Sequence, residues 1–119
     1  MIIAVPTEGK KGMDEKVALH FGRCETYTLI DENGKLIGII GNTSEHMGGV
    51  GLPPELLKKH GAEVLLCGDL GPRAIEMCKS LGIEVWISRA ETVKEIHRLW
   101  KEGKAKKAGP EDACEEHRK

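Results

Sequence analysis

Long apolar segments are missing from this sequence. None of its 119 residues belongs to a run approaching the ~20 apolar residues that a membrane-spanning helix requires, and the apolar start MIIAVP is too short for a signal peptide. A large net charge is missing as well, since 18 basic and 19 acidic residues leave a formal charge of only −1. Such a balance gives no electrostatic basis for binding nucleic acid or a membrane surface. We therefore expect a cytoplasmic protein that binds neither.

Catalytic and nucleotide-binding signatures are missing too. The glycine-rich segments match neither GxxxxGK[ST] nor GxGxxG, and we recognise no Ser/His/Asp, Cys/His or paired-carboxylate arrangement. The four cysteines, Cys24, Cys67, Cys78 and Cys114, are too widely spread for a compact disulfide framework. A domain of this length buries enough core to fold without one. The sequence therefore favours a binding protein with reduced thiols over an enzyme.

Strand and helix signals alternate along residues 1–103 and predict a single α/β domain, followed by a charged, flexible tail at 104–119. The predicted strands are 1–6, 25–31, 35–42, 62–68 and 83–88, and the predicted helices are 50–61, 71–82 and 91–103. Asn33-Gly34 predicts a tight hairpin with positive φ at both central residues. Antiparallel strands come first and βα units then add parallel ones, which predicts a mixed five-stranded sheet covered by three helices.

The strand directions predict that several loops meet at one edge of this sheet. If the second strand is antiparallel to the first, then the first, third, fourth and fifth strands all run the same way. The loops that follow them are 7–24, 42–52, 68–72 and 88–92. Open α/β sheets bind their ligands at such an edge. The segment HFGRC, residues 20–24, belongs to this group of loops.

Two histidine and cysteine pairs are candidate metal ligands. His20 and Cys24 supply nitrogen and sulfur donors suited to zinc, iron or copper, although Gly22 and the strand that follows argue against a helix between them. Cys114 and His117 form a second pair, at C-x-x-H spacing, in the tail. The two pairs could build a Cys2His2 zinc site if the tail folded back across the edge. Otherwise the ligand-type residues of the tail are coincidental.

Two glycine-rich segments lie at the same edge. EHMGGVG (45–51) precedes the first predicted helix, and GDLGPRA (68–74) opens the second. The glycines that would let a ligand approach the backbone are Gly48, Gly49, Gly51 and Gly71. Exposed N–H groups at a helix start attract phosphates or an anionic metal cluster, His46 adds a possible ligand, and Arg73 could offset negative charge. There are two alternative interpretations of these segments. One is that they are ordinary connections, and the other is that they belong to a phosphate- or nucleotide-handling enzyme.

Four segments, taken together, resemble a known family. They are MIIAVPTEG, HFGRCETYTLID, the GGVG segment before a helix, and VLLCGDLGPRAIEMCKSLGIEVW. In this order they are similar to the dinitrogenase iron–molybdenum cofactor biosynthesis proteins, which include NifX, NafY, the C-terminal domain of NifB and small stand-alone archaeal and bacterial homologues. The resemblance spans roughly residues 1–100. It implies a ribonuclease H-like fold with strand order 3-2-1-4-5.

The resemblance also implies a function. Nitrogenase members bind or carry the iron–molybdenum cofactor or its iron–sulfur precursors, and the histidine of their HFG motif, a proposed cluster ligand, matches His20. The resemblance thus implies a non-catalytic carrier of a metal–sulfur cluster that works with a cluster-donating or cluster-accepting protein. The residues expected around the cluster are His20, Gly22, His46, Gly48, Gly49, Gly51 and Gly71, with Cys24 as a further ligand.

Overall fold

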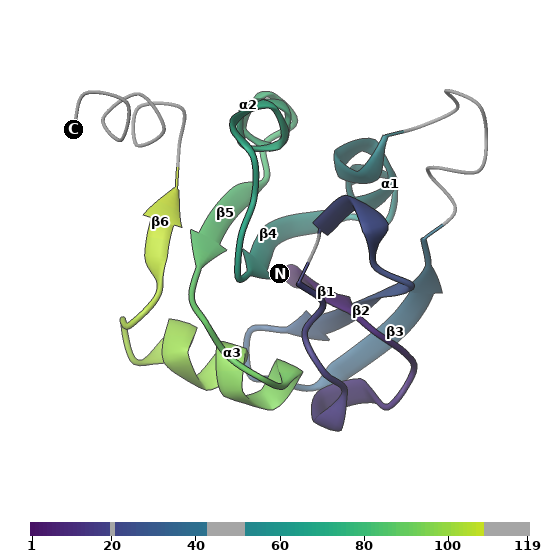
Figure 1. Cartoon of the computed structure of the whole chain (residues 1–119), viewed down its shortest axis with the longest axis vertical. Coiled ribbons are helices and arrows are strands. Elements are labelled where there is room, and N and C mark those ends of the chain that lie inside the picture. The colour runs from purple at the N-terminus through teal and green to yellow at the C-terminus, as the bar shows by residue number, and fades with distance from the viewer. Residues whose placement is uncertain (20, 43–51, 109–119) are drawn as a thin grey trace.

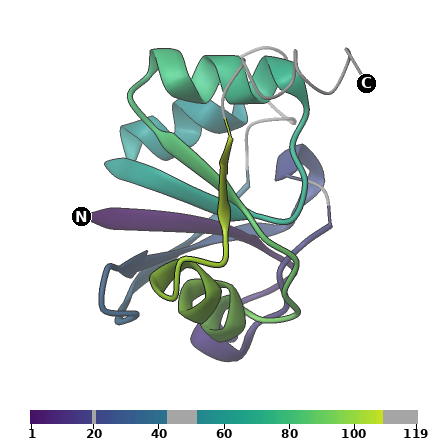
Figure 2. The same ribbon diagram turned by 90° about the vertical axis from the view of Figure 1, so that its left-hand side faces the viewer.

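The computed structural model describes residues 1–19, 21–42 and 52–108, and these form one mixed sheet with helices on both faces (Figures 1 and 2). The strands are β1 (Ile2–Thr7), β2 (Thr26–Asp31), β3 (Leu36–Gly41), β4 (Ala62–Cys67), β5 (Glu84–Ile87) and β6 (Lys106–Ala108). The helices are α1 (Pro53–Lys59), α2 (Pro72–Ser80) and α3 (Val93–Lys101), with two 3-10 turns, η1 (Gly12–Asp14) and η2 (Phe21–Arg23). Within this described part, no helix is long and apolar enough to span a membrane.

The strand order is β3-β2-β1-β4-β5-β6. Parallel pairing joins β1 to β4 and β4 to β5, while the other neighbours are antiparallel. The predicted mixed α/β sheet and the order of its first five strands are therefore confirmed. The sheet has a sixth strand, however, because β6 pairs with β5 inside the segment that we expected to be a tail. Its sequence, KKA, has neither the apolar run nor the alternation by which a strand is recognised.

The predicted hairpin joins β2 to β3, but its turn is longer than expected. The Asp31 carbonyl accepts a hydrogen bond from Gly34 N–H at 3.0 Å, and Asp31 N–H donates to the Lys35 carbonyl at 2.9 Å. Gly34 has φ +88°, whereas no non-glycine residue of the described part has positive φ. The prediction of positive φ at Asn33 is therefore wrong. The loop has three residues, ending in a left-handed glycine, because the Asp31 carboxylate also accepts the N–H groups of Asn33 and Lys35.

The two faces of the sheet have separate cores. In Figure 2, α1 and α2 lie on one face and α3 lies on the other. The first core contains Tyr27, Leu29, Leu57, Leu65, Cys67, Cys78 and Val85. The second contains Ile3, Val5, Ile30, Val64, Leu66, Val93 and Ile96. Successive side chains of a strand point to opposite faces, so Tyr27 and Leu29 of β2 lie in the first core and Ile30 lies in the second.

Two of the cysteines, Cys67 and Cys78, are fully buried. Cys67 and Cys78 both belong to the core beneath α1 and α2. Burial raises the pKa of the Cys67 thiol to about 12 and that of the Cys78 thiol to about 11. Both groups are therefore neutral thiols at physiological pH, and they act as small apolar side chains.

We expect Gly34→Ala to destabilise the protein by about 1–2 kcal/mol, because an L-residue in the left-handed region costs that much. The added Cβ would also lie 3.0 Å from Cε1 of His97, whose Nε2 is 2.9 Å from the Glu32 carbonyl and ties α3 to the turn. Urea denaturation measures the change in unfolding free energy. Gly38→Ala is the matched control, since its Cβ would meet no atom within 4 Å. Equal stability of the two variants would contradict the prediction.

Candidate functional site

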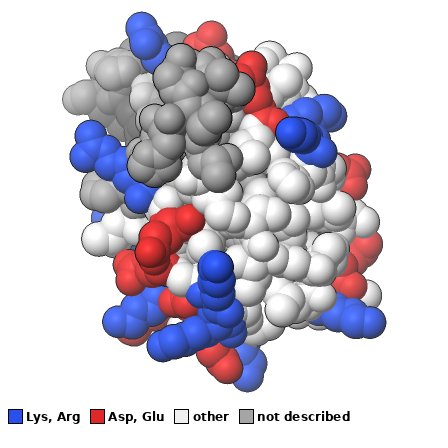
Figure 3. Space-filling model, turned by 90° about the vertical axis from the view of Figure 1, so that its right-hand side faces the viewer, with Lys and Arg blue, Asp and Glu red and all other residues white. Residues whose placement is uncertain are grey.

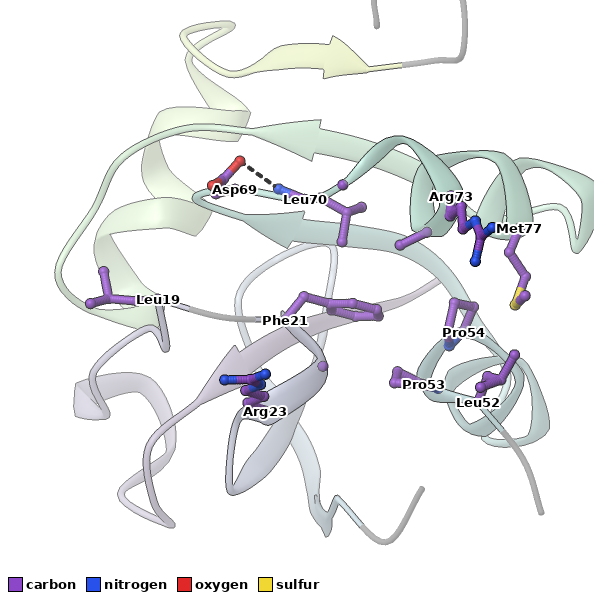
Figure 4. A pocket seen from close by; sticks show the side chains of 13 residues that line it. Leu19, Phe21, Arg23, Leu52, Pro53, Pro54, Asp69, Leu70, Arg73 and Met77 are labelled. Carbon is purple, nitrogen blue, oxygen red and sulfur yellow. Dashed lines mark hydrogen bonds between the residues drawn. The ribbon is translucent and has the colours of Figure 1, made fainter. Parts of the chain in front are cut away.

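A pocket lies where three of the predicted edge loops meet (Figure 4). It has a volume of about 530 Å³. Its walls come from the η2 region, from the start of α1 and from the turn that leads into α2. The lining residues are Leu19, Phe21, Gly22, Arg23, Leu52, Pro53, Pro54, Asp69, Leu70, Gly71, Arg73, Ala74 and Met77. We call this cavity the edge pocket.

Residues 8–18, which follow β1, are fixed by hydrogen bonds, although their sequence reads as a polar loop. Ala18 N–H donates to the Pro6 carbonyl of β1 at 2.8 Å. The Glu15 carboxylate accepts the backbone N–H groups of Lys16, at 2.8 Å, and Lys11, at 3.1 Å. The hydrogen bond from Lys16 is the main reason why the pKa of Glu15 lies below its ordinary value. The chain therefore enters the edge pocket from a well-anchored segment.

The η2 wall is anchored to the core by two side chains from the hairpin. The Tyr27 hydroxyl, which is fully buried, donates to the Phe21 carbonyl at 2.7 Å, and the two rings lie 5.6 Å apart. The Asn42 side-chain amide donates to the carbonyls of Gly22, at 3.1 Å, and Cys24, at 2.9 Å. These bonds hold η2 at a fixed position relative to β2, so this wall of the pocket is preorganised.

The opposite walls are formed by the starts of two helices. Leu52 N–H donates to the Glu55 carboxylate at 2.9 Å, which closes the first turn of α1. Leu70 N–H donates to Asp69 Oδ1 at 2.8 Å, as Figure 4 shows, and Gly71, the N-cap of α2, follows directly. The N–H groups in the first turn of α2 have no acceptor within the helix. This wall therefore contributes the positive end of a helix dipole.

The lining is mainly apolar and carries two cationic side chains. In Figure 4, Phe21 lies between Arg23 and Leu70, while Arg73 and Met77 descend from α2. Arg23 and Arg73 are both exposed, so their guanidinium groups are available to a ligand. An apolar cavity bordered by two arginines suits a ligand that is anionic but weakly hydrated. The described residues contain no group of three or more His, Cys, Asp or Glu side chains that could hold a metal ion.

The structure places three of the predicted site residues. Gly22 and Gly71 both line the edge pocket. Cys24 is only 6% exposed, its thiol donates to the Phe21 carbonyl at 3.2 Å, and it borders a second cavity of about 370 Å³ instead. The other predicted residues, His20, His46, Gly48, Gly49, Gly51, Cys114 and His117, lie outside the described residues. His20 stands in the sequence between Leu19 and Phe21, which both line the edge pocket.

The sequence analysis missed the apolar lining and one of its arginines. It gave no role to Phe21, Arg23, Leu70 or Met77, which all line the pocket. Their common signal is position, because Phe21, Arg23 and Leu70 lie in loops at the predicted ligand-binding edge and Met77 lies in the helix that follows one of them. Position alone, however, does not show which side chains face a cavity.

The chain matches known proteins over most of its length. The profile of the family described as "Dinitrogenase iron-molybdenum cofactor" matches residues 1–103. The uncharacterized protein MJ0580 of Methanocaldococcus jannaschii is 33% identical over 112 residues, which cover 90% of this chain and 91% of the relative. The resemblance seen in the sequence is therefore confirmed.

Solved structures share the fold. The apo form of the orange protein from Desulfovibrio gigas has a TM-score of 0.77 at 28% identity, covering 90% of this chain and 92% of that one. TM1290 of Thermotoga, provisionally assigned as a NifB protein, has a TM-score of 0.73 at 28% identity, covering 89% of this chain and 91% of that one.

Proposed function

The chain belongs to the dinitrogenase iron–molybdenum cofactor family, and on that premise we propose that it binds and carries an anionic metal–sulfur cluster without catalysing a reaction. The observation that supports this function is the edge pocket, an apolar cavity with two arginines at the edge of the sheet that bears the HFG motif. Its volume of about 530 Å³ lies within the usual range for small-molecule sites.

The pocket's chemistry suits sulfide-rich cargo. Sulfides are large, polarizable and weakly hydrated, so apolar walls such as Phe21 and Leu70 make favourable dispersion contacts with them. Arg23 and Arg73 would offset the cluster's negative charge through charge-assisted hydrogen bonds. The first turn of α2, which follows its N-cap Gly71, would add backbone N–H donors. Each of these interactions holds an anion without a covalent bond to the protein.

The described residues that line the pocket offer few ligands to a metal, which suits a carrier better than a permanent metal site. Among the described lining residues the only carboxylate is Asp69, and its Oδ1 already accepts Leu70 N–H. Coordination would then fall mainly to His20, as the family resemblance implies. Cys24 would have to give up its hydrogen bond to the Phe21 carbonyl before its sulfur could join the site. A cluster held by one histidine and by non-covalent contacts can be released to an acceptor.

A carrier also needs access for a partner. Leu19 and Leu52 line the pocket and are 78% and 47% exposed, so both apolar side chains are open to a partner. We propose that a cluster-donating or cluster-accepting protein contacts these side chains when cargo is transferred. Apolar contacts at the pocket's mouth would exclude water while the cluster changes hosts.

Anaerobic reconstitution with ferrous iron, sulfide and molybdate tests the proposal. After desalting, the wild-type chain should retain metal and sulfide and show a visible absorption band. His20→Ala should bind the cluster at least ~10-fold more weakly, because it removes a coordinating nitrogen. His60→Ala, which removes an exposed histidine at the end of α1, is the matched control and should bind normally.

Three outcomes would count against the proposal. The first is no uptake, and the second is uptake that His20→Ala leaves unchanged. The third is a single zinc ion, lost on deleting residues 110–119, which would instead support the zinc site of His20, Cys24, Cys114 and His117.

A further inference from the structure

Cys24 directly follows η2 but borders a different cavity from the edge pocket. Phe21 and Gly22 line the edge pocket, whereas Cys24 lines the second cavity, of about 370 Å³. Glu8 and Glu25 also border this second cavity, and both are exposed. Their carboxylates would repel an anion. The anionic cargo that we propose for the edge pocket is therefore disfavoured in the cavity that the Cys24 side chain borders.

The Cys24 thiol and the Tyr27 hydroxyl donate hydrogen bonds to the same backbone carbonyl. Both bonds are buried, and their distances to the Phe21 oxygen are 3.2 and 2.7 Å. A carbonyl oxygen has two lone pairs and therefore accepts both bonds, although the thiol is the weaker donor. Coordination of a metal would require the Cys24 thiolate. A thiolate has no hydrogen to donate, so metal binding would break the bond to Phe21.

Asn42, which directly follows β3, holds two further carbonyls of the same segment. Its side-chain amide donates to the Gly22 and Cys24 carbonyls, and the amide nitrogen lies 3.9 Å from the Cys24 sulfur. Figure 3 looks onto the β3 side of the molecule and shows a broad area of uncharged side chains. The sequence of β3, LIGIIG, has no charged group that could compete for these carbonyls. Three buried side chains thus hold the turn that carries Phe21 and Arg23.

We infer that Cys24 is a positioning residue of the edge pocket and not a ligand to its cargo, an inference that rests on the proposed function. Its thiol helps to hold the Phe21 carbonyl, and through it the Phe21 ring and the Arg23 guanidinium at the pocket wall. Metal binding would need the same sulfur, so Cys24 cannot serve both roles at once. Because Tyr27 supports the same carbonyl with a stronger bond, the contribution of Cys24 becomes large only when the Tyr27 hydroxyl is removed.

Titration of the full chain with tetrathiomolybdate, an anionic molybdenum–sulfur species, tests this role. Tyr27→Phe and Cys24→Ala each leave the Phe21 carbonyl with one side-chain donor and should weaken binding by about 3-fold at most. Tyr27→Phe/Cys24→Ala removes both donors from this buried carbonyl and should weaken binding by at least ~30-fold. Tyr27→Phe/Cys24→Ser should bind like Tyr27→Phe, because the serine hydroxyl restores a donor. The absorption band of the bound probe should keep its wavelength in every variant, because no bond between metal and Cys24 is lost.

Cys78→Ala is the matched control, because it removes the same group from a fully buried position in α2. It should leave the binding of tetrathiomolybdate unchanged. Two results would overturn the inference. One is an equal loss of binding in Cys24→Ser and Cys24→Ala together with a shifted absorption band, which would make the sulfur a ligand. The other is a loss in Tyr27→Phe/Cys24→Ala that is no larger than the product of the two single losses.

Trypsin tests the same hydrogen bonds without cargo. Arg23 is exposed in η2, so a loosened turn would open the peptide bond after Arg23 to cleavage. Digestion of the folded chain should cleave this bond at least ~10-fold faster in Tyr27→Phe/Cys24→Ala than in the wild type, and Cys24→Ser should restore the slow rate. Cleavage after Arg89, which is also exposed, should not change. An unchanged rate at Arg23 would overturn the inference. Faster cleavage at Arg23 in a protein that binds no tetrathiomolybdate would support the positioning role of Cys24 and contradict only the proposed function.

Discussion

Arg23→Glu/Arg73→Glu is expected to weaken the binding of an anionic metal–sulfur species by on the order of 100-fold, or about 2.7 kcal/mol. The two guanidinium groups lie on different walls of the edge pocket, one on η2 and one on α2. Each is exposed, so solvent limits its attraction for an anion to roughly 0.7 kcal/mol. Reversal removes this attraction and adds a repulsion of similar size. Two such changes together account for the expected loss.

Tetrathiomolybdate, an anionic molybdenum–sulfur species, is a suitable probe, with binding followed by visible absorption. Lys94→Glu/Lys101→Glu is the matched control, because it makes the same change of charge on α3, on the opposite face of the sheet. This control should bind nearly as well as the wild type. Added salt should weaken wild-type binding but have little effect on the residual binding of the arginine variant. Equal losses in both variants would show that overall charge, and not the edge pocket, governs binding.

The location of the pocket was predictable, whereas its lining was not. Strand patterns are local, and the rules of strand direction then bring the loops after β1, β3 and β4 to one edge. The contacts that shape the pocket are long-range. Tyr27 reaches back to the Phe21 carbonyl, and Asn42 holds the carbonyls of Gly22 and Cys24. No periodicity in the sequence encodes such contacts, because each joins residues of different elements through a single side chain.

In the HFGRC segment, too, the sequence alone did not show which side chains face the pocket. Spacing presented His20 and Cys24 as equivalent candidates for metal binding. The structure gives Cys24 a buried position and a hydrogen bond to the Phe21 carbonyl, whereas Phe21 and Arg23 line the edge pocket. The segment therefore combines residues that build the wall with residues that face a ligand. Residue type indicated possible chemistry, but only the turn at η2 shows which side chains reach the cavity.

The edges of the sheet illustrate why some elements escape prediction. The three residues of β6 form a strand because they pair antiparallel with Val85, Trp86 and Ile87 of β5. Their own sequence, KKA, does not favour extended structure. In the hairpin, the Asp31 carboxylate accepts hydrogen bonds from the N–H groups of Asn33 and Lys35. These bonds favour a three-residue loop over the two-residue turn that the Asn33-Gly34 sequence predicts. In both cases a neighbouring partner decides the local conformation, so local propensity is an incomplete guide.

Leu57→Ala is expected to lower the free energy of unfolding by about 2–5 kcal/mol, the usual range for truncating a fully buried leucine. Leu57 is 0% exposed and belongs to the core beneath α1 and α2. α1 has only 7 residues, and so short a helix is not stable by itself. Its position therefore depends on packing against β4 and α2, and Leu57 is fully buried in the core that these elements share.

The same substitution should weaken cluster binding, because Pro53 and Pro54 at the start of α1 form part of the edge pocket. Chemical denaturation measures stability, and tetrathiomolybdate titration measures binding under conditions where the variant is still folded. Leu52→Ala is the matched control, since Leu52 is 47% exposed and lines the pocket without belonging to the core. It should change stability by less than about 1 kcal/mol. An equally small loss of stability in Leu57→Ala would contradict the prediction. The position of α1, and with it this wall of the edge pocket, would then not depend on the burial of Leu57.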